Sequence, residues 1–393
     1  MQDENRYARD KEICMHLGDD QERFTGAVVP PIFGNTLFTY PTLEELAKAE
    51  SQEQNHYVYS RGSNPTVEIA EKKLAALERG EACRCFSSGM AAISATLFNS
   101  LKKGDHVLCI DNLYFSTMDL MKYLQKFGVE HSVVYSVSIS EIENGIKDNT
   151  KVIYIESPTD MTYRLVDLQA VAKLAKNKGI RTIIDNTWAT PLFQKPLEMG
   201  IDIVIHSASK YLGGHSDLLG GAVIASREII DSLFHKELLL FGANLSPYEA
   251  ALLLRGLRTL PFRMKAHQEN GIQVAKFLET HPAVKNVHYP GLRSHPDYEL
   301  GKRQLSGYSG LMGFELEDVH FEQVKKVVNS VELFQVGVSW GSFESLIYSR
   351  NNGKNADRLR KENQSPGLIR LAVGLEDCDL LIGDLKKALD RLL

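Results

Sequence analysis

Two stretches of the sequence decide the fold: residues 181–188, RTIIDNTW, and residues 201–211, IDIVIHSASKY. Each opens with a run of apolar and β-branched residues and then passes into polar ones. A strand that is apolar on both faces belongs to a sheet that helices cover on both sides. Such sheets bind ligands just outside the carboxyl ends of their strands. The polar residues that follow these two runs are therefore the first candidates for a functional site.

The same pattern recurs through the middle of the chain. Further apolar runs lie at His106–Cys109, Ser132–Val137, Val152–Ile155 and Gly221–Ile224. Between the runs, apolar residues at helical spacing appear at Gly89–Leu101, Met118–Phe127, Leu168–Lys178 and Arg227–Lys236. Strands that alternate with helices predict an α/β domain with a parallel or mostly parallel sheet.

The two ends of the chain differ from its middle, and 393 residues favour more than one domain. Residues 1–60 contain one clear helix, near Leu43–Ala49, so we expect an arm that embraces a partner subunit or wraps the surface. Residues 61–250 hold the alternating pattern, and residues 251–393 predict a smaller α+β domain. Its expected elements are helices at Tyr248–Leu257, Met264–Glu279 and Leu380–Leu392 and strands at Gly310–Glu315 and Ile369–Val373.

The composition argues against several classes of protein. The chain is 43% hydrophobic and 24% charged with a net charge of -5, so we expect no nucleic-acid or anionic membrane partner. No run reaches the length of about 20 apolar residues that a membrane helix needs. The polar start predicts a cytoplasmic location. Five scattered cysteines and no HExxH-type cluster argue against disulfides and against a metal site.

Three places could bind a phosphate group. The stretch Phe86–Ala92, which contains Gly89 and Met90, passes from a loop of small residues into a helix, and the N–H groups at a helix start attract anions. Small residues there are also ordinary helix caps. The hydroxyls of Ser207 and Ser209 follow the second deciding strand. The third set is Tyr59 and Arg61, whose phenol and guanidinium are good phosphate ligands, although this stretch could equally be an interface loop.

Three other side chains suit a flat, ring-containing cofactor. Tyr114 could stack on a ring, or be a partly buried loop tyrosine. Asp185 could keep a ring nitrogen protonated, or close an Asx turn. Lys210, at the end of a buried strand, could lose its charge by desolvation and act as an amine nucleophile, whereas most lysines are solvated.

Arg370 lies within the apolar run Leu368–Val373 of the second predicted domain. A charge in such a strand needs a partner. The carboxylate of an amino-acid substrate is one candidate, and an internal acid is the other.

Together these residues resemble the Cys/Met-metabolism (transsulfuration) enzymes that use pyridoxal 5'-phosphate (PLP), above all bacterial cystathionine β-lyase and methionine γ-lyase. The resemblance covers essentially the whole chain. The stretches that carry it are residues 207–217, SASKYLGGHSD, 87–92, SSGMAA, 255–260, RGLRTL, and 369–377, IRLAVGLED. It implies an aspartate-aminotransferase-like fold with a mostly parallel seven-stranded sheet. It also implies a homotetramer, built as a dimer of dimers, whose active sites are shared between subunits.

The resemblance assigns a role to each candidate. Lys210 would hold PLP as a Schiff base and move protons, Asp185 would pair with the pyridine nitrogen, and Tyr114 would stack on the ring and exchange a proton. Thr187 would lie under the ring. Gly89, Met90, Ser207 and Ser209, with Tyr59 and Arg61 of the neighbouring subunit, would hold the phosphate, and Arg370 and Ser339 would hold the substrate carboxylate.

Departures from the family pattern bear on the reaction. Val338 stands where γ-lyases and γ-synthases of cystathionine generally have glutamate, and resembles methionine γ-lyase or bacterial β-lyase. The stretch 114–117, YFST, lacks the cysteine associated with methionine γ-lyase. Asp119 resembles β-lyase and could face a cationic group of the substrate. Asp160 replaces the usual asparagine near the phenolic oxygen of the cofactor, and Gly62 replaces an arginine frequent in bacterial β-lyases.

We therefore expect a carbon–sulfur lyase that β-eliminates cystathionine or cystine-like substrates to pyruvate, ammonia and a thiol. An alternative is a γ-lyase for methionine- or homocysteine-like substrates. Asp119 and Asp160 motivate a variant of it, a γ-lyase for a substrate with a cationic tail, such as canavanine. A γ-replacement synthase acting on an activated homoserine ester is a third possibility. The full set of candidate residues argues against a non-enzymatic relic of the fold.

Overall fold

The computed structural model describes residues 2–317 and 320–393. Its larger sheet has seven strands in the order β1-β7-β6-β5-β4-β2-β3. They are β1 (Ala82–Phe86), β2 (His106–Ile110), β3 (Glu130–Val134), β4 (Thr150–Glu156), β5 (Arg181–Asp185), β6 (Ile203–Ser207) and β7 (Gly221–Ala225). The strands from β6 to β3 run parallel, and β7 is antiparallel to both β6 and β1. The predicted mostly parallel sheet of an α/β fold is confirmed.

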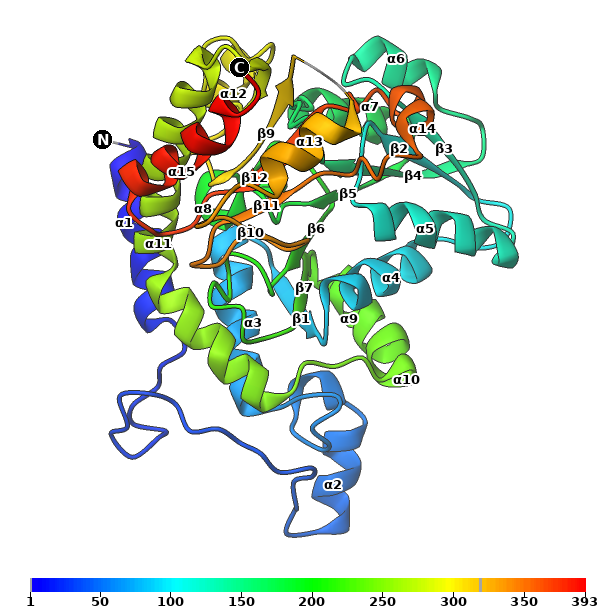
Figure 1. The fold of residues 1–393 in the computed structure, drawn as a ribbon. Coiled ribbons are helices and arrows are strands. Elements are labelled where there is room, and N and C mark those ends of the chain that lie inside the picture. The colour runs from blue at the N-terminus through cyan, green and yellow to red at the C-terminus, as the bar shows by residue number, and fades with distance from the viewer. Residues whose placement is uncertain (1, 318–319) are drawn as a thin grey trace.

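Alternate residues of the central strands face two separate apolar cores, which is why these strands are apolar on both faces. Ile184 and Val204 belong to one core and Ile183 and Ile205 to the other. The helices α3 (Pro65–Glu78), α7 (Leu168–Asn177) and α11 (Pro247–Thr280) contribute to the first core, and α4 (Gly89–Ser100), α5 (Phe115–Leu124) and α9 (Arg227–Leu233) to the second (Figure 1). Short helices α6 (Ile139–Asn144), α8 (Thr190–Phe193) and α10 (Leu239–Phe241) complete this part.

A second, smaller sheet follows α11, in the order β10-β11-β12-β9-β8. Its strands are β8 (Val284–His288), β9 (Leu311–Leu316), β10 (Gln335–Val336), β11 (Leu346–Tyr348) and β12 (Leu368–Ala372). Its helices are α12 (Tyr298–Gln304), α13 (Phe321–Val328), α14 (Ala356–Lys361) and α15 (Cys378–Asp390). Apart from the β10–β11 pair, neighbouring strands are antiparallel.

The helix α11 is one continuous element where the sequence predicts two. Pro261 lies inside it, and a proline removes one backbone N–H from the helical ladder. The carbonyl that loses its helical partner is that of Leu257, four residues earlier. The helix nevertheless continues through Pro261, and the expected boundary at residues 250 and 251 falls within this helix.

The first 60 residues contain a helix that the sequence analysis did not predict, α1 (Gln2–His16), besides α2 (Leu43–Glu50). It packs against α3 and α11 of its own chain. Its apolar face is narrow, since only Ile13 and Cys14 are both apolar and buried, and Asp10 is buried beside them. Because a buried acid lies among so few buried apolar residues, this stretch of sequence lacks the apolar spacing that predicts a helix. The segment between α1 and α2 runs outside the two sheets (Figure 1).

The cysteines Cys83 and Cys85 lie buried in β1, and all five cysteines are free. Within the described residues, no group of His, Cys, Asp or Glu side chains could hold a metal ion. No helix in the same part of the chain is long and apolar enough to cross a membrane.

Candidate active site

Lys210 lies just beyond the end of β6. Its backbone N–H donates to the Ser207 carbonyl at 3.1 Å, and this hydrogen bond closes a turn at the end of the strand. Nζ donates to Ser339 Oγ at 2.7 Å and lies 5.5 Å from the centre of the Trp340 ring. Burial, followed by the nearby Arg370 guanidinium, lowers the pKa of this amine to about 8. A lowered pKa gives this partly buried amine a larger neutral fraction than a solvated lysine has, and the neutral amine is the nucleophile for a carbonyl carbon.

Asp185 ends β5, the strand next to β6. Its Oδ1 accepts the Thr187 N–H at 3.0 Å and also the Thr187 hydroxyl, so the expected Asx turn is present. The same hydroxyl accepts the Ser207 N–H at 2.8 Å. Thr187 therefore ties the ends of the two strands together. Burial raises the pKa of Asp185, while Thr187 and Lys210 act in the opposite direction.

The start of α4 lies against the end of β6. A Cβ on Gly89 would come within 2.9 Å of Ser207, and one on Gly221 would come within 2.2 Å of the Ser88 carbonyl, so both glycines allow a close approach that a side chain would block. Ser88 caps α4 by accepting the Ala91 N–H at 3.0 Å. The Gly89 and Met90 N–H groups precede the first hydrogen bond of this helix, and so can donate to an anion.

The hydroxyl of Ser209 accepts the Gly220 N–H at 3.0 Å. This contact fixes Ser209 in the turn between β6 and β7, two residues beyond Ser207. Both hydroxyls thus follow the same strand that carries Lys210.

Tyr114 precedes α5 and is 40% exposed. Its N–H donates to Glu156 Oε1 at 2.8 Å. Glu156 is buried at the end of β4 and faces Asp185 across the β4–β5 ladder. Burial, together with the charges of Asp185 and Asp160, raises the pKa of Glu156 well above its usual value. The loop that carries the tyrosine is therefore attached to the same strand ends as Asp185.

Arg370 is buried in β12 without an internal acid. Its Nη2 donates to the Val338 and Ser339 carbonyls at 2.7 and 3.4 Å, and the guanidinium lies 4.9 Å from the Tyr348 ring centre. No carboxylate in the described part of the chain forms an ion pair with it. Val338 is exposed, whereas Ser339 turns its hydroxyl to Lys210. A buried guanidinium with only carbonyl partners is well suited to an incoming carboxylate.

The two acids expected near the substrate already have cationic partners. Asp160 pairs with Arg350, and each of these side chains is about 15% exposed, at 15% and 14%. Asp119 lies on the exposed side of α5 and pairs with Lys122 at 2.9 Å. Asp160 is therefore engaged by a partly buried cation, whereas the pair of Asp119 with Lys122 is largely exposed and leaves that carboxylate accessible.

Tyr59 and Arg61 are exposed. The Arg61 guanidinium stacks 5.4 Å from the Tyr59 ring centre, and Tyr59 bridges to Leu37 of the segment before α2. Neither side chain forms a hydrogen bond or ion pair with the site residues around Lys210 in the described part of the chain.

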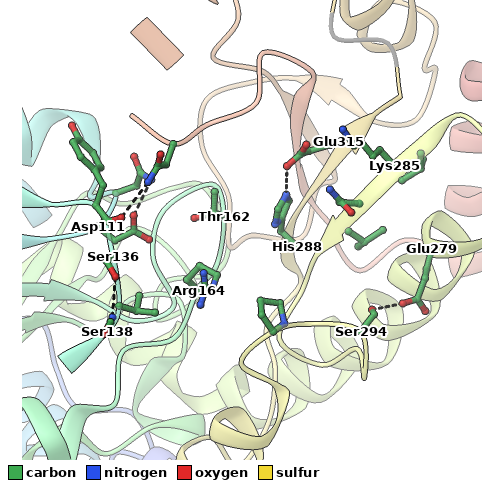
Figure 2. A pocket seen from close by; sticks show the side chains of 18 residues that line it. Asp111, Ser136, Ser138, Thr162, Arg164, Glu279, Lys285, His288, Ser294 and Glu315 are labelled. Carbon is green, nitrogen blue, oxygen red and sulfur yellow. Dashed lines mark hydrogen bonds and ion pairs between the residues drawn. The ribbon is translucent and has the colours of Figure 1, made fainter. Parts of the chain in front are cut away.

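A cavity of about 700 Å³ lies between the β8 edge of the smaller sheet and loops of the larger domain (Figure 2). Its charged side chains mostly have partners already: His288 pairs with Glu315 at 2.6 Å, and Arg164 pairs with Asp297 at 2.6 Å. Lys210 is not among the residues that line it. Although this cavity is large, Lys210 does not line it, so we do not place the chemistry there.

The residues that meet around Lys210 fit PLP. The carboxylate of Asp185 is partly buried, and a cationic ring nitrogen would stabilise its charged form. The α4 start and Ser207 offer N–H and hydroxyl donors to a phosphate, and Lys210 offers an amine to an aldehyde. The close contact of Gly89 with Ser207 brings these donors together.

Sequence reasoning did not find Arg350 or Glu156 as parts of this site. Glu156 ends an apolar run just as Asp185 does, so the same signal could have found it. Arg350 has no such signal, because it meets Asp160 across 190 residues of sequence.

Comparisons with known proteins agree with this geometry. The family model described as Cys/Met metabolism PLP-dependent enzyme matches residues 11–390. L-methionine gamma-lyase of Fusobacterium nucleatum subsp. nucleatum is 40% identical over 386 residues, which cover 96% of this chain and 97% of that protein. Cystathionine beta-lyase MetC of Bacillus subtilis strain 168 is 40% identical over 373 residues, which cover 94% and 93%. The crystal structure of metB from Corynebacterium glutamicum has a TM-score of 0.91 and 34% identity, and covers 98% of each chain.

Proposed function

The chain belongs to the Cys/Met-metabolism PLP-dependent enzymes, and we propose that it is the member of this family that β-eliminates cystathionine or cystine-like amino acids at Lys210. PLP-dependent carbon–sulfur lyase activity on an amino-acid substrate is the property of the family. The observation that carries the proposal is the Lys210 amine, held at 2.7 Å from Ser339 with its pKa lowered to about 8.

The residues proposed to hold the cofactor are those that meet at the ends of β5 and β6. Asp185 would pair with the ring nitrogen, Thr187 would keep that carboxylate in place, and Ser207, Ser209 and the α4 start would bind the phosphate. When bound, PLP supplies an electron sink for the pair of electrons left at Cα after proton removal.

The chain's own residues would do the rest. Arg370 binds the substrate carboxylate through a bidentate contact. Lys210, displaced by the substrate amine, takes the Cα proton, and Ser339 orients its Nζ. Tyr114, partly exposed at the start of α5, donates a proton to the departing sulfur.

One base, Lys210, and one acid, Tyr114, are sufficient for β-elimination, because that reaction removes a single proton, from Cα. Asp160 is paired with Arg350 in a partly buried contact, so it gives no support for a canavanine-like cationic substrate, whereas Asp119 forms only an exposed pair with Lys122. The apolar Val338 at the exposed edge of the site suits a thioether or disulfide side chain.

A γ-lyase is the second candidate, because of the names of relatives. Methionine γ-lyases of Fusobacterium nucleatum and Pseudomonas putida are 40% identical to this chain over 96% of its length. In γ-elimination a second proton would leave Cβ, and Lys210 could take it as well.

The experiment that separates the candidates identifies the oxo acid released from cystathionine, cystine and methionine. Pyruvate from cystathionine supports β-elimination, and a four-carbon oxo acid contradicts it. Incubation with an activated homoserine ester and cysteine tests for a γ-replacement synthase, which would form cystathionine instead of releasing an oxo acid.

We also propose that the working unit is a homo-oligomer, a tetramer of two dimers, in which Tyr59 and Arg61 complete the site of a neighbouring subunit. Both are exposed, and in the described part of the chain neither forms a hydrogen bond with Lys210. Exposed apolar residues gather in the same region and at α10 and α11: Val28, Val29, Ile32, Leu37, Leu240, Phe241, Tyr248 and Phe262. Such residues are typical of subunit interfaces. The cytoplasmic location expected from the sequence stays a prediction.

A further inference from the structure

An ion pair joins the two domains beside the proposed cofactor site. Asp160 lies in the loop after β4 of the larger domain, and Arg350 lies two residues after β11 of the smaller domain. Arg350 Nη2 contacts Asp160 Oδ2, and both side chains are largely shielded from water. A pair in this position is stronger than one on the surface, and its two members are costly to separate.

Asp160 belongs to a cluster of acids. Glu156 ends β4 and faces Asp185 of β5 across the ladder. Burial comes first among the causes that raise the pKa of Glu156, and the charges of Asp185 and Asp160 follow, whereas Arg350 acts in the opposite direction. The positive charge of Arg350 thus offsets the negative charge that Asp160 places near Glu156.

The backbone around Asp160 is fixed independently of this pair. The Asp160 N–H donates to the Asn112 carbonyl at 3.0 Å, and its own carbonyl accepts the Thr162 N–H at 2.8 Å. Met161 and Tyr163 have positive φ angles of 68° and 49°. Since the backbone is held in this way, Arg350 decides the direction of the Asp160 side chain.

Arg350 also connects Asp160 to the proposed substrate arginine. Tyr348, the last residue of β11 and two residues before Arg350, pairs with Arg370 across the β11–β12 ladder, and its ring centre lies 4.9 Å from the Arg370 guanidinium. A contact that anchors the end of β11 to the larger domain therefore also places Arg370 relative to Lys210.

We propose that Arg350 is a positioning residue for the active site: it turns Asp160 towards the smaller domain, balances its charge, and so allows an aspartate to stand beside the acids that surround the cofactor. The inference rests on the proposed site at Lys210. Arg350 and Asp160 both belong to this chain, and their pairing explains how an aspartate at position 160 is compatible with cofactor binding.

The pH dependence of the site involves every charged or titratable group that faces this pair. On the β4 side these groups are Glu156, which Asp185 of β5 faces in turn, and Tyr163. Around Arg350 they are the groups that line a cavity with it: Asp111, Asp119, Lys122, Tyr348, Arg358 and Glu362. Removing the Arg350 charge leaves one more uncompensated anion among them. An added negative charge holds protons more tightly, so the pH at which the visible band of the bound cofactor changes should rise.

Three variants of the full-length protein test this inference: Arg350→Gln, Asp160→Asn and the double variant. Arg350→Gln should weaken PLP affinity by about tenfold, raise the pH of the spectral transition and raise KM more than it lowers kcat. The double variant, which has no unpaired charge, should match Asp160→Asn within about twofold in all three measurements. This comparison remains decisive if Arg350→Gln alone does not fold.

Arg164→Gln is the matched control, because Arg164 also joins the larger domain to the smaller one, through Asp297, and lines the cavity away from Lys210. It should leave the spectral transition unchanged. The inference is overturned if Arg350→Gln behaves as this control does, or if the double variant is as impaired as Arg350→Gln. Failure of the proposed site itself would differ, since the wild-type protein would then show no cofactor band that depends on Lys210.

Discussion

At the residue scale, the chemistry depends on the surroundings of Lys210 more than on the lysine itself. Most lysines are solvated and charged at neutral pH. Here burial and the charge of Arg370 lower the pKa to about 8, and Ser339 fixes the direction of Nζ. The lowered pKa of Lys210 also determines how the rate of PLP uptake depends on pH.

Uptake of PLP by the apoenzyme should become faster as pH rises through about 8, because the neutral amine is the nucleophile and its fraction increases above the pKa. Stopped-flow absorbance at a series of pH values measures this rate. Arg370→Met removes one cause of the lowered pKa, so its midpoint should move to higher pH. A rate that is flat from pH 6 to 9 (about three units around the midpoint) would contradict the assignment.

Arg370→Met should also raise KM for an amino-acid substrate by about tenfold to a hundredfold, the cost of losing a charge-assisted contact. Arg370→Lys should recover part of the loss, because the charge returns without the planar fork. Steady-state kinetics on both variants measures the effect. Equal KM values for the wild type and Arg370→Met would show that the substrate carboxylate binds elsewhere.

Single residues of the site were predictable to different degrees. Asp185 and Lys210 each follow an apolar run, so the sequence indicates both directly. The partner of Asp160 was not predictable, because Arg350 follows a strand of the smaller sheet and lies 190 residues away in the sequence. The sequence predicted that Asp160 and Asp119 face a cationic substrate group, whereas the structure pairs Asp160 with the partly buried Arg350 and leaves Asp119 in an exposed pair with Lys122. Pairing of charges across long separations is decided by tertiary packing, which no local pattern records.

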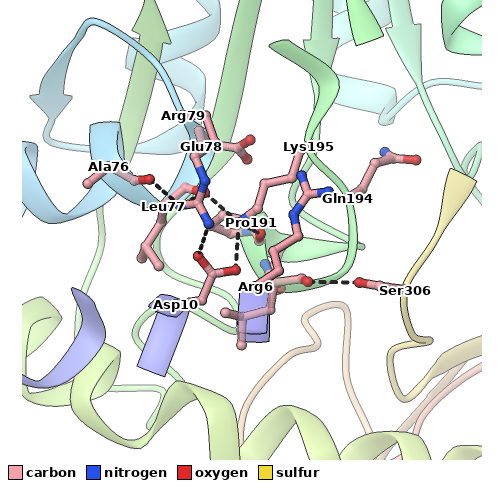
Figure 3. A network of polar contacts seen from close by, with 12 residues as sticks. Arg6, Asp10, Ala76, Leu77, Glu78, Arg79, Pro191, Gln194, Lys195 and Ser306 are labelled. Carbon is pink, nitrogen blue, oxygen red and sulfur yellow. Dashed lines mark hydrogen bonds and ion pairs between the residues drawn. The ribbon is translucent and has the colours of Figure 1, made fainter. Parts of the chain in front are cut away.

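At the scale of elements, α1 is attached to the larger domain by a buried network (Figure 3). Asp10 of α1 pairs with Lys195 at 2.8 Å and with Arg79 at 2.7 Å, and Asp10 and Lys195 are 2% and 4% exposed. Glu78, next to Arg79, accepts His206 Nε2 at 2.6 Å, immediately before Ser207. The network therefore runs from the first helix to the end of the strand that carries the site.

Asp10→Asn should lower the free energy of unfolding by about 3 kcal/mol, since it leaves two cations without their shared acid in a buried place. Glu198→Gln is the control. Glu198 pairs with Arg6 at the more exposed end of the same network, with 43% of its side chain exposed, so its loss should cost below about 1 kcal/mol. Urea unfolding of both variants gives the comparison. Equal losses would mean that Asp10 is not an essential anchor of α1.

The central strands and helices were predictable because their apolar spacing repeats. The elements that escaped prediction lack this signal for identifiable reasons. The strand β1 carries Arg84, whose charge is paired with Glu71 at 3.0 Å, and α1 buries an acid. The break expected in α11 at Pro261 is absent, since the helix runs from Pro247 to Thr280 with the proline inside it.

At the scale of the whole molecule, the proposed sharing of active sites predicts complementation between inactive variants. Lys210→Ala and Arg61→Ala subunits, refolded together, should form dimers with one intact site, and recover about a quarter of wild-type activity. Activity of the mixture measures this. Lys210→Ala mixed with Arg370→Met is the control, since both residues belong to the same subunit's site and no intact site can form. No recovery in the first mixture would contradict a site that uses Arg61 from a neighbour.

The central claim is that Lys210 is the residue that carries the cofactor, and borohydride reduction tests it most directly. Reduction of the holoenzyme makes the bond between cofactor and lysine permanent, and peptide mass spectrometry then locates it. We predict a single modified lysine, Lys210, and no modification of the buried Lys73 and Lys195, which are 0% and 4% exposed. A cofactor found on either of these lysines, or on none, would contradict the account.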